Sequence, residues 1–71
     1  MELNVKKTFD GPPVIVDTRG AAAYLRLSKR TMENLRYQDK GPAFVRLGAR
    51  AVRYRIADLE AYAAARVVGG A

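Results

Sequence analysis

Three side chains between Ser28 and Asp39 carry hydrogen-bonding groups that match the edges of nucleic-acid bases. Arg30 can donate two hydrogen bonds to guanine, Asn34 can bond adenine through both of its amide groups, and Glu33 can accept a hydrogen bond from cytosine. Arg30 and Asn34 are four residues apart, so on a helix they lie one turn apart on the same face. The spacing predicts a helix that carries these groups into the major groove of DNA.

Polar and cationic side chains surround these base-reading candidates. Lys29 and Arg36 are expected to bind phosphates, contacts that fix the position of a protein on a duplex. Tyr37 keeps three alternatives open: a phosphate contact, a contact with a thymine methyl group, or closure of the core against the following segment. The candidates on this helix are Ser28, Lys29, Arg30, Glu33, Asn34, Arg36 and Tyr37.

The positive charge of the chain is concentrated in one stretch. The whole sequence has 13 Lys and Arg against 7 Asp and Glu, a net charge of +6. Residues 26–55 contain nine basic and two acidic residues, so nine minus two gives +7 there. Because bound phosphates release their counterions, a polyanion is the expected partner. Charge alone does not separate DNA from RNA or an acidic membrane, and a solvated basic face without a partner is the alternative.

The composition excludes several classes of chemistry. The chain has no cysteine and no histidine, which excludes a disulfide framework, most zinc sites and the usual nucleophile–base pairs of enzymes. Asp58 and Glu60 are explained as acids near the start of a helix. No segment reaches the roughly 18 apolar residues of a membrane span. We therefore expect no enzymatic activity, no cofactor, no metal ion and no membrane association, and we expect a cytoplasmic location.

A chain of 71 residues fits one small domain, which buries only about 60% of the surface that its unfolded form exposes. The Asp-Gly-Pro-Pro run at 10–13 breaks helices and strands, and the segment before it has no clear period. The predicted organisation is a flexible N-terminal arm at 1–13, a domain at 14–66 and a flexible tail at 67–71.

The domain is expected to begin with an extended apolar piece at 14–16 and a first helix at 19–25. Asp17 or Thr18 can cap this helix, because either side chain accepts a hydrogen bond from a free amide. Gly20 inside the helix costs up to about 1 kcal/mol relative to alanine. Packing against the rest of the domain must therefore stabilise this helix.

A second helix is expected to begin at Ser28, a good N-cap. The connection before it is so short that the two helices must cross steeply, which is helix-turn-helix geometry. Met32 and Leu35 are expected to face inward together with Leu25. The helix is expected to end near the Lys-Gly-Pro run at 40–42, where the glycine supplies a left-handed cap and the proline cannot continue.

The apolar period then changes from 3.6 to 2, which predicts strands at 44–47 and 52–55 joined by a glycine-containing tip. Arg46 and Arg53 are expected on the outer face of this hairpin and Arg50 at its tip, where they can contact phosphates. The alternative role of this arginine row is to protect a strand edge from aggregation.

A third helix is expected to close the domain over 56–66, because its apolar residues fall on one stripe. The predicted fold class is therefore α+β, a small winged helix-turn-helix with three helices and a two-stranded β-hairpin wing. We also expect Thr18 and Arg19, at the start of the first helix, to contact phosphate.

Several short motifs follow one another in order between residues 18 and 66: Ala21-Ala22, Tyr24-Leu25, Ser28 to Thr31, Gly41-Pro42, Val45 to Gly48, Arg53-Tyr54 and Asp58-Leu59. Their joint order and spacing resemble the excisionase and AlpA-like winged-helix family, compact relatives of the MerR DNA-binding domain. The chain departs from that pattern at Gly20, where an acidic helix former is usual, and in its longer N-terminal arm.

The resemblance implies that the second helix enters the major groove and that the wing lies on the adjacent backbone or minor groove. It also implies a protein without enzymatic activity, acting in one of two ways. An excisionase bends attachment-site DNA and directs an integrase toward excision, whereas an AlpA-like protein regulates transcription. The alanine-rich and arginine-rich composition is typical of a GC-rich host, so an actinobacteriophage excisionase is the specific expectation.

The expected partners are double-stranded DNA with attachment-site or operator repeats, an integrase, and neighbouring copies on the same DNA, all at the nucleoid of a bacterial host cell. An RNA-binding or protein-interaction module on the same scaffold is a further alternative. Single-stranded RNA is usually recognised by exposed aromatic side chains. Outside the expected core the chain offers only Phe9, Tyr37 and Phe44, so this alternative ranks below DNA binding.

Overall fold

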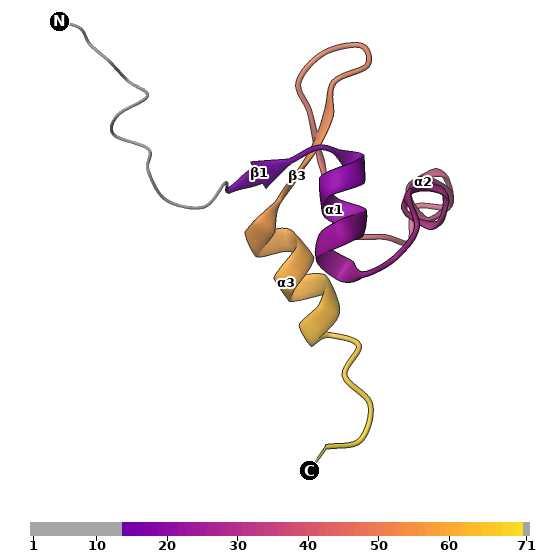
Figure 1. Cartoon of the computed structure of the whole chain (residues 1–71), viewed down its shortest axis with the longest axis vertical. Coiled ribbons are helices and arrows are strands. Elements are labelled where there is room, and N and C mark those ends of the chain that lie inside the picture. Colours follow the sequence, from indigo (N-terminus) through magenta and orange to yellow (C-terminus); the bar gives the residue numbers. More distant parts are fainter. Residues whose placement is uncertain (1–13, 71) are drawn as a thin grey trace, which may run out of the picture.

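The computed structural model describes residues 14–70, which form three helices and three strands. In chain order these are β1 (Ile15–Val16), α1 (Thr18–Leu25), α2 (Lys29–Tyr37), β2 (Val45–Arg46), β3 (Val52–Arg55) and α3 (Ile56–Ala64) (Figure 1). This arrangement confirms the predicted α+β winged helix-turn-helix fold. The predicted arm at 1–13 and the last residue of the predicted tail lie outside the described residues.

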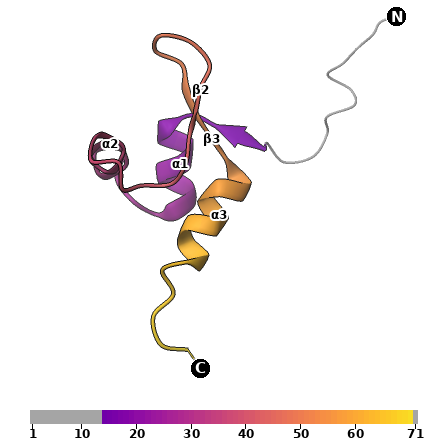
Figure 2. The same cartoon turned by 180° about the vertical axis from the view of Figure 1, so that it is seen from behind.

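The first helix, α1, lies at the centre of the domain and contacts both α2 and α3. In Figure 1, α2 is seen along its axis while α1 runs in the plane of the picture, so the two helices cross steeply, as the short connection predicts. The view from behind shows the loop between β2 and β3 projecting beyond the helices (Figure 2). We call β2, residues 47–51 and β3 the wing.

The sheet has three antiparallel strands in the order β1-β3-β2, one more than the predicted two-stranded wing. β1 pairs with the base of the wing, where Val16 lies opposite Tyr54. The amide of Ile56 extends this ladder by donating to the carbonyl oxygen of Val14 at 2.9 Å. The sequence predicted that residues 14–16 are extended. It did not predict their pairing with β3, because a run of three apolar residues does not indicate which strand it pairs with.

Arg46 and Arg53 do not lie on the same face of the wing, as the sequence had predicted that they would. Arg46 lies opposite Val52, and Val45 lies opposite Arg53. Directly opposed residues share a face of an antiparallel pair, so Arg46 is on the face of Val52 while Arg53 is on the other face. The prediction that both arginines lie on one outer face is wrong, because Phe44 and not Val45 packs against the core.

The start of α1 explains the glycine that helix propensity disfavours. The Asp17 carboxylate caps the helix by accepting from the amide of Gly20 at 2.8 Å. A Cβ at position 20 would stand 2.9 Å from Cβ of Val16. A glycine is therefore required where β1 turns into α1.

Left-handed residues end both helices of the helix-turn-helix. α1 ends at Arg26, with φ 61° and ψ 37°, where the amides of Arg26 and Leu27 donate back to Ala23 and Ala22. In α2 the C-cap is Gln38, and the left-handed residue is the next one, Asp39, with φ 59°. The sequence predicted the left-handed residue in the 40–42 run, and this position is wrong because the left-handed residue is Asp39.

Gly41 is instead required by space, because a Cβ there would stand 2.9 Å from Cβ of Leu35. Leu35 is half-buried and packs at this margin. Of the two α2 residues expected to face inward, Met32 is buried and Leu35 is half-buried at the edge of the core.

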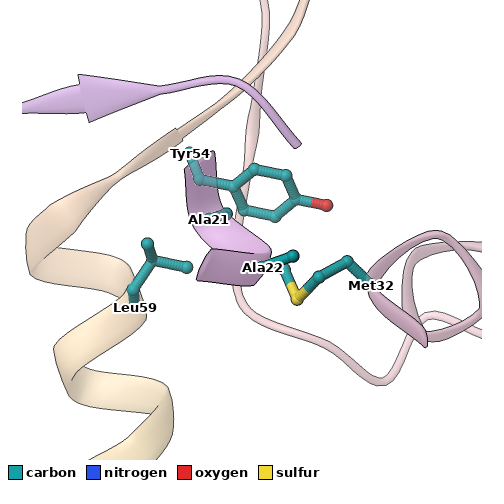
Figure 3. Packing of buried hydrophobic residues seen from close by; sticks show 5 residues of the cluster. All are labelled: Ala21, Ala22, Met32, Tyr54 and Leu59. Atoms are coloured by element: carbon teal, nitrogen blue, oxygen red, sulfur yellow. The ribbon is translucent and has the colours of Figure 1, made fainter. Parts of the chain in front are cut away.

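The core is a cluster of five buried side chains: Ala21, Ala22, Met32, Tyr54 and Leu59 (Figure 3). They come from α1, α2, β3 and α3, so every helix contributes to it. The two alanines of α1 allow the other helices to approach closely, and partly buried Leu25 packs against the cluster as expected. This core holds α2 and the wing in a fixed relation, which positions the candidate site.

Candidate nucleic-acid interface

The exposed side of α2 carries two stripes of polar residues. Met32 is buried, and the helical angle of 100° per residue places Arg30, Asn34 and Tyr37 opposite it. All three are exposed, and Tyr37 exposes 78% of its surface. We call these three residues the outer ridge. Among residues 14–70, neither the Arg30 nor the Asn34 side chain has a hydrogen-bond or ion-pair partner, so both side chains are available to a ligand.

The second stripe of α2 lines a groove toward the wing. Lys29, Glu33 and Arg36 follow one another at helical spacing and form one wall of it. The groove encloses about 360 Å³, and we call it the basic groove. Its lining residues are Asp17, Thr18, Arg19, Lys29, Glu33, Arg36, Arg50, Val52 and Arg53. Five of these are cationic and two are acidic, which suits a phosphate-rich strand.

The basic groove brings together many of the residues predicted from the sequence as phosphate contacts. Thr18 and Arg19 of α1 meet Lys29 and Arg36 of α2, and Arg50 and Arg53 of the wing complete the set. Arg46 is absent from this lining. Its guanidinium lies 5.7 Å from the centroid of the Phe44 ring.

The first turn of α2 is fixed by its own side chains. Ser28 caps the helix as predicted, because its hydroxyl oxygen accepts from the amide of Thr31 at 3.0 Å. Lys29 and Glu33 form an ion pair at 3.4 Å between Nζ and Oε2. Exposed pairs of this kind contribute only about 0.3–0.5 kcal/mol. Breaking the pair, so that Glu33 binds a base and Lys29 binds a phosphate, therefore costs little.

The partly buried Arg36 side chain is fixed by hydrogen bonds that could not be predicted from the sequence. Its Nη1 donates to the hydroxyl oxygen of Tyr54 at 2.9 Å and to Oγ1 of Thr18 at 3.2 Å. Its guanidinium carbon lies 5.8 Å from the ring centroids of both Tyr37 and Phe44. We call these five residues the Arg36 cluster. The available signal was Tyr54 itself, because a buried tyrosine hydroxyl needs a partner.

The wing presents its remaining arginines in different environments. Arg50 is exposed at the tip, whereas Arg53 is half-buried and donates from Nη1 to the carbonyl oxygen of Val52 at 2.9 Å. Arg53 therefore has a fixed direction beside the basic groove. Arg50 is free to adapt to a partner.

Two acidic residues of α3 have side-chain partners, one in an ion pair and one in a hydrogen bond. Arg55 binds both carboxylate oxygens of Asp58, at 2.7 and 2.9 Å, and this hydrogen bonding lowers the pKa of the Asp58 carboxyl. Glu60 accepts from the Tyr24 hydroxyl at 2.9 Å, which raises the pKa of Tyr24. Both acids are therefore bound to other side chains of the domain. The positive charge of Arg55, the N-cap of α3, is balanced by the carboxylate of Asp58.

Within residues 14–70, no helix is long and apolar enough to cross a lipid bilayer. None of the curated proteins compared with this chain matches it. Residues 16–67, most of the chain, match a family model described as a helix-turn-helix domain. The steep crossing of α1 and α2, the wing and this match agree, and the chain therefore belongs to the helix-turn-helix domain family and is a DNA-binding protein.

Proposed function

We propose that the protein recognises specific sequences in double-stranded DNA. The observation that supports this best is the arrangement of α2, whose outer ridge is free of internal partners while its neighbouring stripe lines the basic groove. In this proposal Arg30 and Asn34 bond base edges in the major groove, with Glu33 as a third reader once it leaves Lys29. Tyr37 contacts a thymine methyl group or a phosphate at the end of the ridge.

The basic groove takes the DNA backbone in the same proposal. Lys29, Arg19 and Arg53 bind phosphates there, and Arg36 presents its remaining N–H groups. Thr18 and the capping Ser28 lie at the starts of their helices, where a backbone phosphate is stabilised by the helix dipole. Arg50 and Arg46 extend the contact along the wing, each from its own side.

Salt dependence tests this arrangement. Several phosphates bound at once release several counterions, so the logarithm of affinity should fall steeply as the logarithm of salt concentration rises. Arg50→Ala should lower that slope by about one unit. Arg66→Ala is the matched control, because it removes the same charge from just beyond the C-terminal end of α3, where Arg66 stacks on Tyr62. A flat titration for the wild-type chain would contradict duplex binding.

We further propose that the biological role is that of a phage excisionase, as the resemblance of residues 18–66 implies. The placement of Arg46 and Arg53 on opposite faces of the wing supports it, because such a wing can contact both backbones that flank a minor groove. One small domain covers little DNA, so several copies are expected on adjacent direct repeats. Bending 20–30 base pairs by 40–90° costs on the order of 1–6 kcal/mol, which the summed phosphate contacts of several copies offset.

Circular permutation and recombination assays separate this role from its alternative. For an excisionase, curvature should grow as copies add to the repeats, and a supplied integrase should change from integration to excision. If the DNA stays straight at saturation and the direction of recombination does not change, the AlpA-like transcription regulator replaces the excisionase. Specific duplex binding would stand in either case.

A further inference from the structure

We infer that Arg36 acts as a positioning residue that links the orientation of α2 to the wing when DNA binds. The inference rests on the proposed DNA recognition and deepens it. Arg36 belongs to α2, yet its partners come from other parts of the domain: Thr18 from α1, Tyr54 from β3 and Phe44 from the entry to the wing. A single guanidinium thus joins the three elements that border the basic groove.

The hydrogen bonds of Arg36 leave part of its guanidinium for a phosphate. A guanidinium has five N–H donors, and the two bonds from Nη1 to Tyr54 and Thr18 occupy two of them. Five minus two leaves three donors, on Nη2 and Nε. Arg36 is also one of the residues that line the basic groove. A backbone phosphate in this groove therefore meets a guanidinium whose direction is already set from inside the domain.

The aromatic rings around Arg36 restrict it further. Tyr37 and Phe44 each hold their ring centroids 5.8 Å from the guanidinium carbon, and Phe44 packs on Tyr54 with 6.0 Å between centroids. Long arginine side chains lose considerable rotamer freedom when they bind. In Arg36 this loss has already occurred in the free protein, so DNA binding does not have to order the side chain.

Tyr54 offers a way to test positioning apart from charge. Its side chain is only 1% exposed, so it does not touch DNA, and Tyr54→Phe removes one hydroxyl without changing any charge. We expect Tyr54→Phe to bind a duplex selected by the wild-type chain about tenfold more weakly, the fold-change of one lost hydrogen bond to a charged group. The salt slope should stay unchanged, because the number of phosphates contacted is the same.

A variant of Arg36 that keeps the positive charge gives a second test of the positioning role. Lysine has no planar fork, so Arg36→Lys should lose affinity to a similar extent at an unchanged salt slope. The double variant should lose little more than either single variant, because both changes break the same link. Arg36→Ala should in addition lower the salt slope by about one unit. Tyr62→Phe is the control for loss of a tyrosine hydroxyl from outside the cluster.

The measurements are made on chains shown by circular dichroism to be folded at the assay temperature, so that a loss of stability alone does not lower affinity. If Tyr54→Phe and Arg36→Lys both bind with wild-type affinity, only the charge of Arg36 matters and the inference is overturned. Losses that add fully in the double variant would also overturn it. If the wild-type chain binds no duplex at all, the proposed function fails and the inference fails with it, a result distinct from the first two.

Discussion

Replacing Gly20 by alanine should destabilise the domain, although alanine is the better helix former. Helix propensity alone favours alanine by about 1 kcal/mol. In the structure, a Cβ at position 20 stands 2.9 Å from Cβ of Val16 and 3.3 Å from Oδ1 of Asp17. Cβ of Val16 is bonded directly to the backbone, so it can move only if β1 moves with it.

The two effects can be compared in magnitude. Overpacking of this kind typically costs 1–3 kcal/mol, and displacing Asp17 weakens an N-cap worth about 1 kcal/mol. After the gain in propensity is subtracted, the free energy of unfolding should fall by about 1–3 kcal/mol. For a domain of this size each kcal/mol lowers Tm by about 4–8 °C.

Thermal unfolding followed by circular dichroism measures this change. Ala23→Gly is the matched control, because Ala23 is exposed on the same helix and reports helix propensity without the close approach. We expect both variants to melt below the wild-type chain. If Gly20→Ala instead melts higher, by about as much as Ala23→Gly melts lower, the contact between β1 and α1 does not constrain position 20 and the reasoning fails.

Three further outcomes concern stability. Arg26→Gly should raise Tm by a few degrees, whereas Arg26→Ala should not. A left-handed residue other than glycine costs about 1–2 kcal/mol, and the greater conformational entropy that glycine gives the unfolded chain cancels roughly half of the gain. Equal melting temperatures for the two variants would contradict the left-handed turn. Met32→Ala should lower the free energy of unfolding by about 2–5 kcal/mol and Leu35→Ala by clearly less, and chemical denaturation that ranks them in reverse would contradict the core. The lowered pKa of Asp58 means that its carboxylate stabilises the fold at a pH above the ordinary carboxyl pKa. The free energy of unfolding should therefore fall as pH drops from about 5 toward 2, and it should fall more in the wild-type chain than in Asp58→Asn. Parallel pH profiles would show that the Arg55 contact is unimportant.

The sequence predicted those features that depend on local chemistry. Ser28 caps α2 as expected because the cap requires only a hydroxyl before a helix-forming run. The position of the hairpin followed from the change in apolar period. Helical spacing also predicted that Arg30 and Asn34 share one face of α2, and both are exposed.

Features that depend on distant partners were not predictable in the same way. Both Phe44 and Val45 are apolar, so the period of 2 did not decide which faces inward, and the larger ring packs against Tyr54. The pairing of β1 and the bonds of Arg36 join residues 18 or more positions apart. The left-handed residue at Asp39 was missed because Gly41 nearby is the stronger local signal, and it serves spacing instead.

The most direct test of the account compares Arg30→Ala with Arg50→Ala on two duplexes, one selected in vitro by the wild-type chain and one of random sequence. Arg30 belongs to the outer ridge and Arg50 to the tip of the wing, so the two variants lose the same charge from surfaces with different proposed roles. Arg30→Ala should reduce discrimination at one base pair by about 1–3 kcal/mol, whereas Arg50→Ala should weaken binding to both duplexes alike. If Arg30→Ala loses equal affinity on selected and random DNA, the outer ridge of α2 does not read bases.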